Sequence, residues 1–452
     1  LAWIFATLKM WPGLSPPLVF GVKYLLLFSG LTLFYLAARN VLVRPGVSAA
    51  AVACWAMTFY IGWGAHEDLL NTVALMACLS MTLHAMTRIL TWRRPRDWIY
   101  LGVAMGLGLL TSYLYIVFPV ALLLAAALSS FFRDALNPLR LLLSLAVALA
   151  VFSPFGVWLA THTDDLRRAV QEYMIGWQLE PEWLIRAERG AISFGRSLLE
   201  FSLPVSMLWA FLFWPLWLPI LYPMFDRRST EEEPHERAWR TLAATTVLIA
   251  AGLFAIAVLA GVQRFKGAWM APVLFLGPIW MFAHVKRAGE FPIAIRAHAA
   301  TAILLIALVF AGRFVEWRGE LTACDEDGCR PYTPVQQWAE AIADAGFVSG
   351  TIVGADPHLT GNLMAEFPEA RVLDAGLSPE AFPPPAGRGA CLAVWRNSDM
   401  MPQALSDYLV ISLETRPRGT EPQGAVRRYF RGSYDKAATL YYRFIPPSGK
   451  CR

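Results

Sequence analysis

Long apolar runs alternate with short polar segments over the first two thirds of this chain. Runs of about 18 residues or more can cross the roughly 30 Å hydrocarbon core of a bilayer as helices. The pattern therefore predicts an all-α polytopic membrane domain over residues 1–313, with ten apolar segments. They cover residues 17–38, 47–63, 69–90, 98–112, 114–131, 139–160, 200–222, 240–261, 269–285 and 294–313.

The segments on either side of Ser112 and Tyr113 are short and almost continuous, so one long kinked helix is an alternative to two spans. Counting the two segments separately places five arginine-containing loops on the inner face, whereas the short outer loops near residues 65 and 113 contain no Lys or Arg. This bias follows the positive-inside rule and puts the carboxyl terminus outside. Merging the pair would reverse every later loop, so the charge pattern favours ten spans.

Composition agrees with a membrane protein, since 56% of residues are hydrophobic and 16% are charged. The net charge of +5 comes from basic residues in short loops, where membrane topology explains them, so we expect no nucleic-acid partner. Frequent Ala and only six Lys among 39 basic residues suggest a GC-rich bacterial genome and an inner (plasma) membrane location. The chain opens on Leu1 with no signal-peptide pattern, and we expect an amino-terminally truncated fragment.

Beyond residue 313 the content of charge, Gly and Pro rises and no further span follows. Helical spacing and alternating apolar positions predict a small extracytoplasmic α/β domain over residues 314–452. The expected helices cover residues 334–346, 357–367 and 402–409, and the expected strands begin near residues 351, 371, 391, 426 and 438.

Four cysteines lie in this carboxyl-terminal region, an even number in a part of the chain that we expect outside, which favours disulfides. Our first pairing joins Cys324 to Cys329 and leaves Cys391 with Cys451. A zinc site on the Cys-x4-Cys pair would need two more soft ligands, and we identify none nearby. Two further cysteines lie within apolar spans and are expected to be inert.

A polar cluster, His66-Glu67-Asp68, stands between the second and third expected spans. Ionisable side chains at the rim of a membrane are costly unless they face water, a partner or a substrate. The cluster is therefore our main candidate site, with carboxylates for acid-base work or for a divalent metal as a possible cofactor. The purely structural alternative is that Asp68 caps the following helix and interacts favourably with its dipole.

A second candidate is the short outer turn 263–269, which contains Arg264, Lys266 and Trp269, the last as a candidate substrate-binding residue. Its cations break the positive-inside bias and suit an anionic headgroup or a pyrophosphate-like group. Snorkelling toward lipid headgroups is the ordinary alternative. The longer 161–199 connection is also basic, but long loops are exempt from the rule, and its Asp164 and Asp165 are best explained as caps of a surface helix.

Three stretches together resemble the polyprenyl-phosphate-sugar-dependent glycosyltransferases of family 39, which include protein O-mannosyltransferases and have the GT-C membrane fold. They are the run from Gly62 to Val73, the run from Trp98 to Tyr113, and the run from Phe265 to Pro272. No single one is a sharp motif, but their order and spacing match over residues 1–313. The stretch from Gly361 to Pro368 extends the resemblance into the tail.

The resemblance implies inverting transfer of a sugar from a polyprenyl-phosphate donor to a glycolipid, glycan or protein acceptor at the outer face of the membrane. Carried over by position, Asp68 with Glu67 and His66 would serve catalysis, and Arg264 and Lys266 would bind the donor phosphate. The family's principal acidic residue would precede residue 1. A non-enzymatic transporter or lipid flippase is the alternative, for which we would expect charged residues near mid-span or broken helices in two matching halves.

Overall fold

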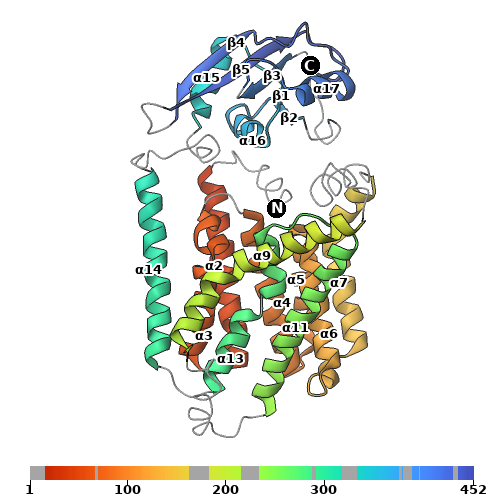
Figure 1. The fold of residues 1–452 in the computed structure, drawn as a ribbon. Coiled ribbons are helices and arrows are strands. Elements are labelled where there is room, and N and C mark those ends of the chain that lie inside the picture. Colours follow the sequence, from red (N-terminus) through yellow and green to blue (C-terminus); the bar gives the residue numbers. More distant parts are fainter. Residues whose placement is uncertain are drawn as a thin grey trace. The chain divides into compact units, whose positions relative to one another are not determined.

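The computed structural model describes residues 16–66, 70–161, 183–214, 234–287, 292–317, 333–375, 379, 389–396, 398–430 and 436–451. The chain divides into two compact units, Leu1–Phe310 and Ala311–Arg452. The first is helical throughout its described part, and the second contains a five-stranded sheet (Figure 1).

Helices of the first unit follow the apolar runs of the sequence. They are α2 (Pro16–Leu42), α3 (Pro45–Met57), η1 (Phe59–Trp63), η2 (Gly64–His66), α4 (Leu70–Trp92), α5 (Pro95–Thr111), η3 (Tyr113–Ile116), α6 (Val117–Leu128), η4 (Arg133–Ala135), α7 (Pro138–Thr161), α9 (Trp183–Leu212), α11 (Pro234–Leu259), η7 (Gly267–Met270), α12 (Ala271–Leu274), α13 (Gly277–Arg287) and α14 (Pro292–Trp317).

Within the described part of the chain, five helices are long and apolar enough to cross a membrane, or seven spans if two bent pairs are included. The five are α2, α4, α7, α11 and α14. Expected spans 98–112, 114–131 and 200–222 fall on α5, α6 and α9, which do not meet this length and composition. The chain is a multi-pass membrane protein, and the count of ten spans stays a prediction.

The proposed alternative of one kinked helix over the fourth and fifth expected spans is not observed. Ser112 has an extended backbone (φ −161°, ψ 137°) and separates α5 from η3. Its hydroxyl accepts a hydrogen bond from the Leu114 N–H at 3.2 Å and so caps the second helix.

Burial separates central helices from peripheral ones. The most apolar window of α4 is 83% buried inside the protein, against 11% for α7 and for α14. An apolar surface of that extent would not face water, so α7 and α14 present it to lipid. Central packing is aromatic: Trp55 of α3 lies 5.8 Å from Phe34 of α2 and 5.4 Å from Phe275, between ring centroids. Phe275 also contacts Phe118 of α6, so one cluster ties four segments together.

Helices α5 and α7 approach closely because α5 carries glycine where they meet. A Cβ on Gly102 would lie 2.5 Å from the Ser144 carbonyl oxygen, and one on Gly106 would lie 2.5 Å from Cβ of Val151. Small residues four positions apart are a common means of close helix packing in membranes.

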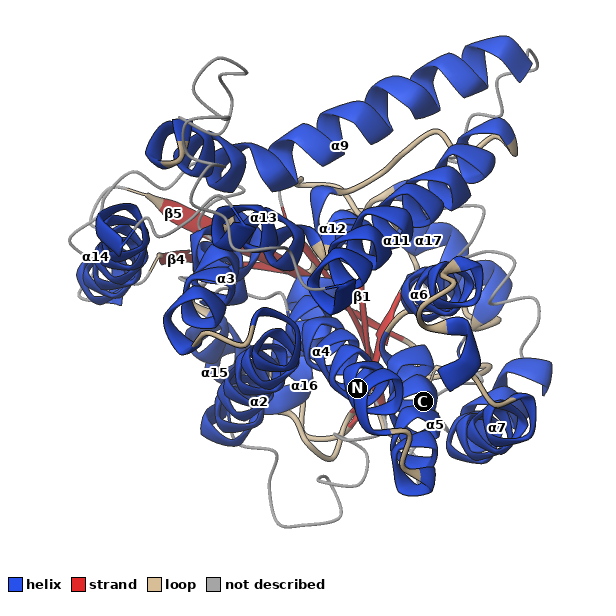
Figure 2. Cartoon of the chain, turned by 90° about the horizontal axis from the view of Figure 1, so that it is seen from below, coloured by secondary structure: helices blue, strands red, loops and turns tan. Residues whose placement is uncertain are grey.

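Helix α9 differs from its neighbours in direction. It crosses the bundle and is seen lengthwise in Figure 2, where α2, α7 and α14 are seen nearly end-on. The sequence had suggested a surface connection up to residue 199 and a span from residue 200. Instead, residues 183–212 form one continuous helix, and residues 215–222 of the expected span lie outside the described part.

The second unit is a small α/β fold, as its sequence pattern predicts. Its elements are α15 (Val335–Asp344), β1 (Gly350–Gly354), α16 (Pro357–Glu366), β2 (Arg371–Asp374), β3 (Ala390–Arg396), α17 (Gln403–Asp407), η10 (Tyr408–Ser412), β4 (Gly424–Tyr429) and β5 (Ala437–Ile445). The strand order is β2-β1-β3-β5-β4, with β1 parallel to β2 and β3 and the other pairs antiparallel. Helices α15 and α16 pack on one face of the sheet, and α17 and η10 on the other.

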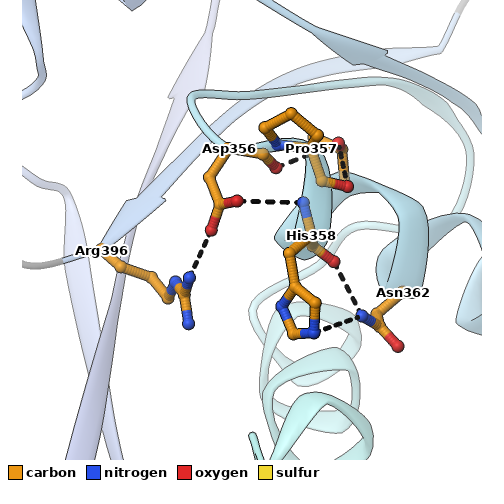
Figure 3. Close-up of polar contacts among 6 residues, drawn as sticks. Asp356, Pro357, His358, Asn362 and Arg396 are labelled. Atoms are coloured by element: carbon orange, nitrogen blue, oxygen red, sulfur yellow. Dashed lines mark hydrogen bonds and ion pairs between the residues drawn. The ribbon is translucent and has the colours of Figure 1, made fainter. Parts of the chain in front are cut away.

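The turn from β1 into α16 is held by polar contacts (Figure 3). Asp356 caps α16 by accepting a hydrogen bond from the His358 N–H at 2.9 Å, and its other carboxylate oxygen pairs with Arg396 at the end of β3. The Asn362 amide donates to the His358 carbonyl at 2.7 Å. These contacts show that the stretch from Gly354 to Pro357 serves as the amino-terminal cap of α16.

A disulfide joins Cys391, at the start of β3, to Cys451 near the end of the chain. This is the second of the two expected pairs. Cys324 and Cys329 lie outside the described residues, so their pairing stays a prediction. Cys54 and Cys78, within helices of the first unit, are not disulfide-bonded.

Candidate functional site

The second expected span breaks just before the polar cluster. Helix α3 ends at Met57, and the chain bends by 77° into Phe59–His66. Thr58 is extended at the break (φ −72°, ψ 138°), and its hydroxyl donates to the Trp55 carbonyl at 2.8 Å. Gly62 is required here, because a Cβ would overlap the Ala56 carbonyl oxygen. The break turns the residues after Thr58 away from the axis of α3.

His66 is the described member of the predicted catalytic cluster. Its Nδ1 lies 3.0 Å from the Tyr24 hydroxyl of α2, and its ring lies 5.6 Å from that of Phe310 on α14. Glu67 and Asp68 lie outside the described residues, so their roles stay predictions. Across the described ranges, no three His, Cys, Asp or Glu side chains gather as a metal site would need.

The basic turn after α11 is held against α9. Phe265 is buried, and Ser193 accepts a hydrogen bond from its N–H at 2.8 Å while Ser197 donates to its carbonyl at 3.0 Å. Lys266 has an extended backbone (φ −104°, ψ 142°), in which neighbouring side chains point to opposite sides. Arg264 and Lys266, on either side of Phe265, are accordingly exposed. Burial of one aromatic ring thus presents two cations to the surface.

Helix α9 supports the same turn further along. Trp183 donates from its indole nitrogen to the Leu259 carbonyl at 2.9 Å. Gly190 lies directly on the Val262 carbonyl oxygen, leaving no room for a Cβ. Beyond the turn, the Lys266 ammonium lies 6.0 Å from the centre of the Trp269 ring, within reach of a cation–π interaction. Trp269 therefore neighbours the cation and is also partly buried against the core of the first unit. Its predicted role in binding substrate stays a prediction.

Tyr60 connects the broken helix to the basic turn. Its hydroxyl lies against Gly267, where a Cβ would overlap it, and its ring stacks on Phe201 of α9 with centroids 5.7 Å apart. Glu200 directly precedes Phe201 in α9 and therefore lies close to the Tyr60 side chain that stacks on that ring. Segments 59–66, 193–201 and 264–269 therefore converge.

An apolar cavity of ≈ 720 Å³ begins beside this point. Its walls come from α3, α9, α11 and the α12–α13 segment, and include Trp55, Thr58, Phe201, Ser202 and Leu274. Phe201 contributes to the wall of the cavity and also stacks on the Tyr60 ring, so Tyr60 and Glu200 neighbour one of its walls. An apolar compartment with polar groups beside it suits an amphipathic ligand.

Sequence reasoning missed Tyr60 and Glu200. A signal for Glu200 was present, because Arg189, Ser193, Ser197 and Glu200 recur at spacings of three or four and mark one polar stripe on a helix. We had divided that stripe between a loop and a span. Nothing in the local sequence distinguishes Tyr60 from other aromatic residues near membrane interfaces.

Comparison with known proteins agrees with the resemblance. Residues 2–158 match the family described as dolichyl-phosphate-mannose-protein mannosyltransferase. The chain is 25% identical to the lipopolysaccharide core galacturonosyltransferase RgtB of Rhizobium johnstonii, over 99% of this chain and 88% of that protein. It is 24% identical to RgtA of the same organism, over 88% of this chain and 78% of that protein.

The family match covers the broken helix, and the two relatives extend the similarity through α9 and the basic turn. These are membrane glycosyltransferases, as the order of the three resembling stretches predicted. The chain is accordingly similar to membrane glycosyltransferases, to the family model over residues 2–158 and to RgtB over nearly its whole length.

Proposed function

We propose that this protein moves a sugar from a polyprenyl-phosphate-linked donor to a lipid, glycan or protein acceptor at the outer face of the membrane. The observation that carries the proposal is the apolar cavity whose wall residue Phe201 stacks on Tyr60, because Tyr60 in turn lies against Gly267, next to the exposed Lys266. A polyprenyl chain needs an apolar compartment within the bilayer, whereas its phosphate needs cations at the surface.

Arg264 and Lys266 have the chemistry that the leaving group requires. When the bond between the anomeric carbon and the phosphate oxygen breaks, negative charge develops on the departing lipid phosphate, and fixed cations stabilise it in the transition state. The acceptor hydroxyl attacks the anomeric carbon from the opposite side and loses its proton to a carboxylate. We assign the role of proton acceptor to Asp68, with Glu67 and His66 as its neighbours.

The relatives suggest the sugar and the acceptor. Because RgtB and RgtA are named for galacturonosyl transfer to the lipopolysaccharide core, we propose a uronic acid as the transferred sugar and a lipopolysaccharide-like glycolipid as the acceptor. A second negative charge on the donor is consistent with a basic turn that holds two cations and with the further arginines of α9, which include Arg189 and Arg196.

We further propose ten spans in a bacterial inner membrane, with the carboxyl-terminal domain in the periplasm. The loop charges support this arrangement, and so does the disulfide between Cys391 and Cys451, since disulfides form outside the reducing cytoplasm. Reporter fusions after residues 136, 261 and 452 test it. Under this arrangement, a periplasm-active reporter works after residues 261 and 452 and fails after residue 136.

Sugar transfer tests the function directly. Membranes containing the protein are supplied with radiolabelled polyprenyl-phosphate galacturonic acid and a lipopolysaccharide acceptor, and wild type is compared with Asp68→Asn and Lys266→Ala. Each variant should lose at least tenfold in rate at equal expression, as mutations in acid-base and charge-stabilising groups do. Arg427→Ala, which removes an exposed cation of β4, serves as the control and should retain the wild-type rate.

One observation favours a second candidate function, that of a transporter or lipid flippase. Two helix pairs are broken, at Thr58 and between Leu274 and Gly277, and discontinuous helices are frequent at transporter binding sites. Movement of lipid or solute by reconstituted protein that transfers no sugar from any donor would support this candidate and contradict the glycosyltransferase.

A further inference from the structure

Tyr60 and Glu200 form a polar pair between the apolar cavity and the basic turn. Tyr60 comes from the broken helix after α3, and Glu200 comes from the middle of α9. The tyrosine ring stacks on Phe201, a wall of the cavity, and the hydroxyl lies at Gly267, next in the chain to Lys266. A ligand whose chain fills the cavity and whose phosphate meets the turn would carry its sugar past this pair.

We propose that Tyr60 and Glu200 bind a hydroxyl group of the sugar that is transferred. This inference rests on the proposed function and adds the residues that recognise the sugar. Glu200 is exposed and Tyr60 is half-buried, so the pair is open to a ligand on one side. A carboxylate accepts hydrogen bonds from sugar hydroxyls, and a phenol both donates and accepts.

The position of the pair argues against two other roles. A carboxylate that receives the acceptor proton must lie across the anomeric carbon from the leaving phosphate, whereas Glu200 adjoins Phe201 and Tyr60, and the Tyr60 hydroxyl lies at Gly267, next to Lys266. A carboxylate would also repel the phosphate itself. A neutral sugar hydroxyl close to the phosphate is the remaining group of the donor that Glu200 can hold with a favourable hydrogen bond.

Packing fixes the position of the Tyr60 side chain. Gly267 leaves its Cβ position open for the phenol, and the ring stacks on Phe201, so the hydroxyl is set by its neighbours on two segments. A side chain that is held by packing is preorganised to bind a ligand at low entropic cost.

Donor analogues test the inference. Polyprenyl-phosphate galacturonic acid and its 2-, 3- and 4-deoxy forms are compared in the wild type, Tyr60→Phe, Glu200→Gln and the control Glu188→Gln, an exposed acid on the same helix. With the intact donor, kcat/KM should fall about 10- to 100-fold in the first two variants, as expected when a hydrogen bond to a charged group is lost. In wild type, kcat/KM should fall by a similar factor with the one deoxy donor that lacks the hydroxyl bound by the pair. In Glu200→Gln, kcat/KM should fall less than about threefold with the same donor, because the contact to that hydroxyl is already weakened.

The outcomes are distinguishable. If wild type transfers the sugar, and each deoxy donor lowers kcat/KM by the same factor in wild type and in Glu200→Gln, the pair does not touch the sugar. This inference is then overturned, while the proposed function stands. If wild type transfers no sugar from any donor, the proposed function fails and the inference fails with it. If the melting temperatures of both variants stay within a few degrees of wild type, the loss of transfer is not caused by unfolding. A lower kcat/KM that coincides with a large drop in melting temperature would contradict a recognition role.

Discussion

Gly190→Ala should separate the basic turn from α9. A Cβ at this position would come well inside 3.0 Å of the Val262 carbonyl oxygen, and backbone atoms cannot rotate away as a side chain would. Ordinary non-bonded contact is about 3.5 Å, so α9 and the turn must move apart by roughly 1 Å. Overpacking of this kind costs about 1–3 kcal/mol of unfolding free energy.

The same displacement should impair activity. Ser193 and Ser197 hold Phe265 next to Lys266, so a shift at Val262 is transmitted along a few residues of backbone to the proposed phosphate-binding group. A misplacement of about 1 Å can lower a catalysed rate by as much as 100-fold. We expect the rate of sugar transfer to fall by more than tenfold, with a lower melting temperature in detergent.

Gly195→Ala is the matched control, because this glycine is in the same helix and has nothing within 4 Å of its Cβ position. Alanine is the better helix former by about 1 kcal/mol, so the control should be neutral or slightly stabilised. Equal melting temperatures and equal transfer rates for the two alanine variants would refute the packing of Gly190 on the turn.

Three further predictions concern stability, and the unfolding of purified protein in detergent measures each. Replacing Cys391 and Cys451 together by Ser opens a loop of 60 residues, which the chain-entropy relation converts to about 4 kcal/mol; reductant should destabilise wild type by more than it destabilises the variant. Gly106→Ala should cost about 1–3 kcal/mol by forcing α5 from α7, whereas Gly252→Ala, in open space, should cost nothing. Asp97→Ala should cost about 2–4 kcal/mol, because Asp97 is 2% exposed and pairs with an arginine at 2.8 Å; an unchanged melting temperature would contradict this pairing.

Local sequence was sufficient for much of this molecule. Apolar runs identified the membrane helices because each run must satisfy its own backbone hydrogen bonds in lipid. Alternating apolar positions identified the strands of the second unit, and the basic turn was evident because Arg264 and Lys266 violate the charge bias of outer loops. These features depend on neighbours within a few residues, so periodicity and composition reveal them.

Only the tertiary structure brought Tyr60, Glu200 and Gly267 together. They come from three segments that are far apart in the chain, and no spacing or charge pattern in the sequence relates any one of them to the other two. The continuity of α9 was missed because its first half is polar and its second half apolar, so hydropathy divided one helix into two elements. The way in which helices cross and pack decides which polar residues share a site. The periodicity of the sequence does not specify those crossing angles.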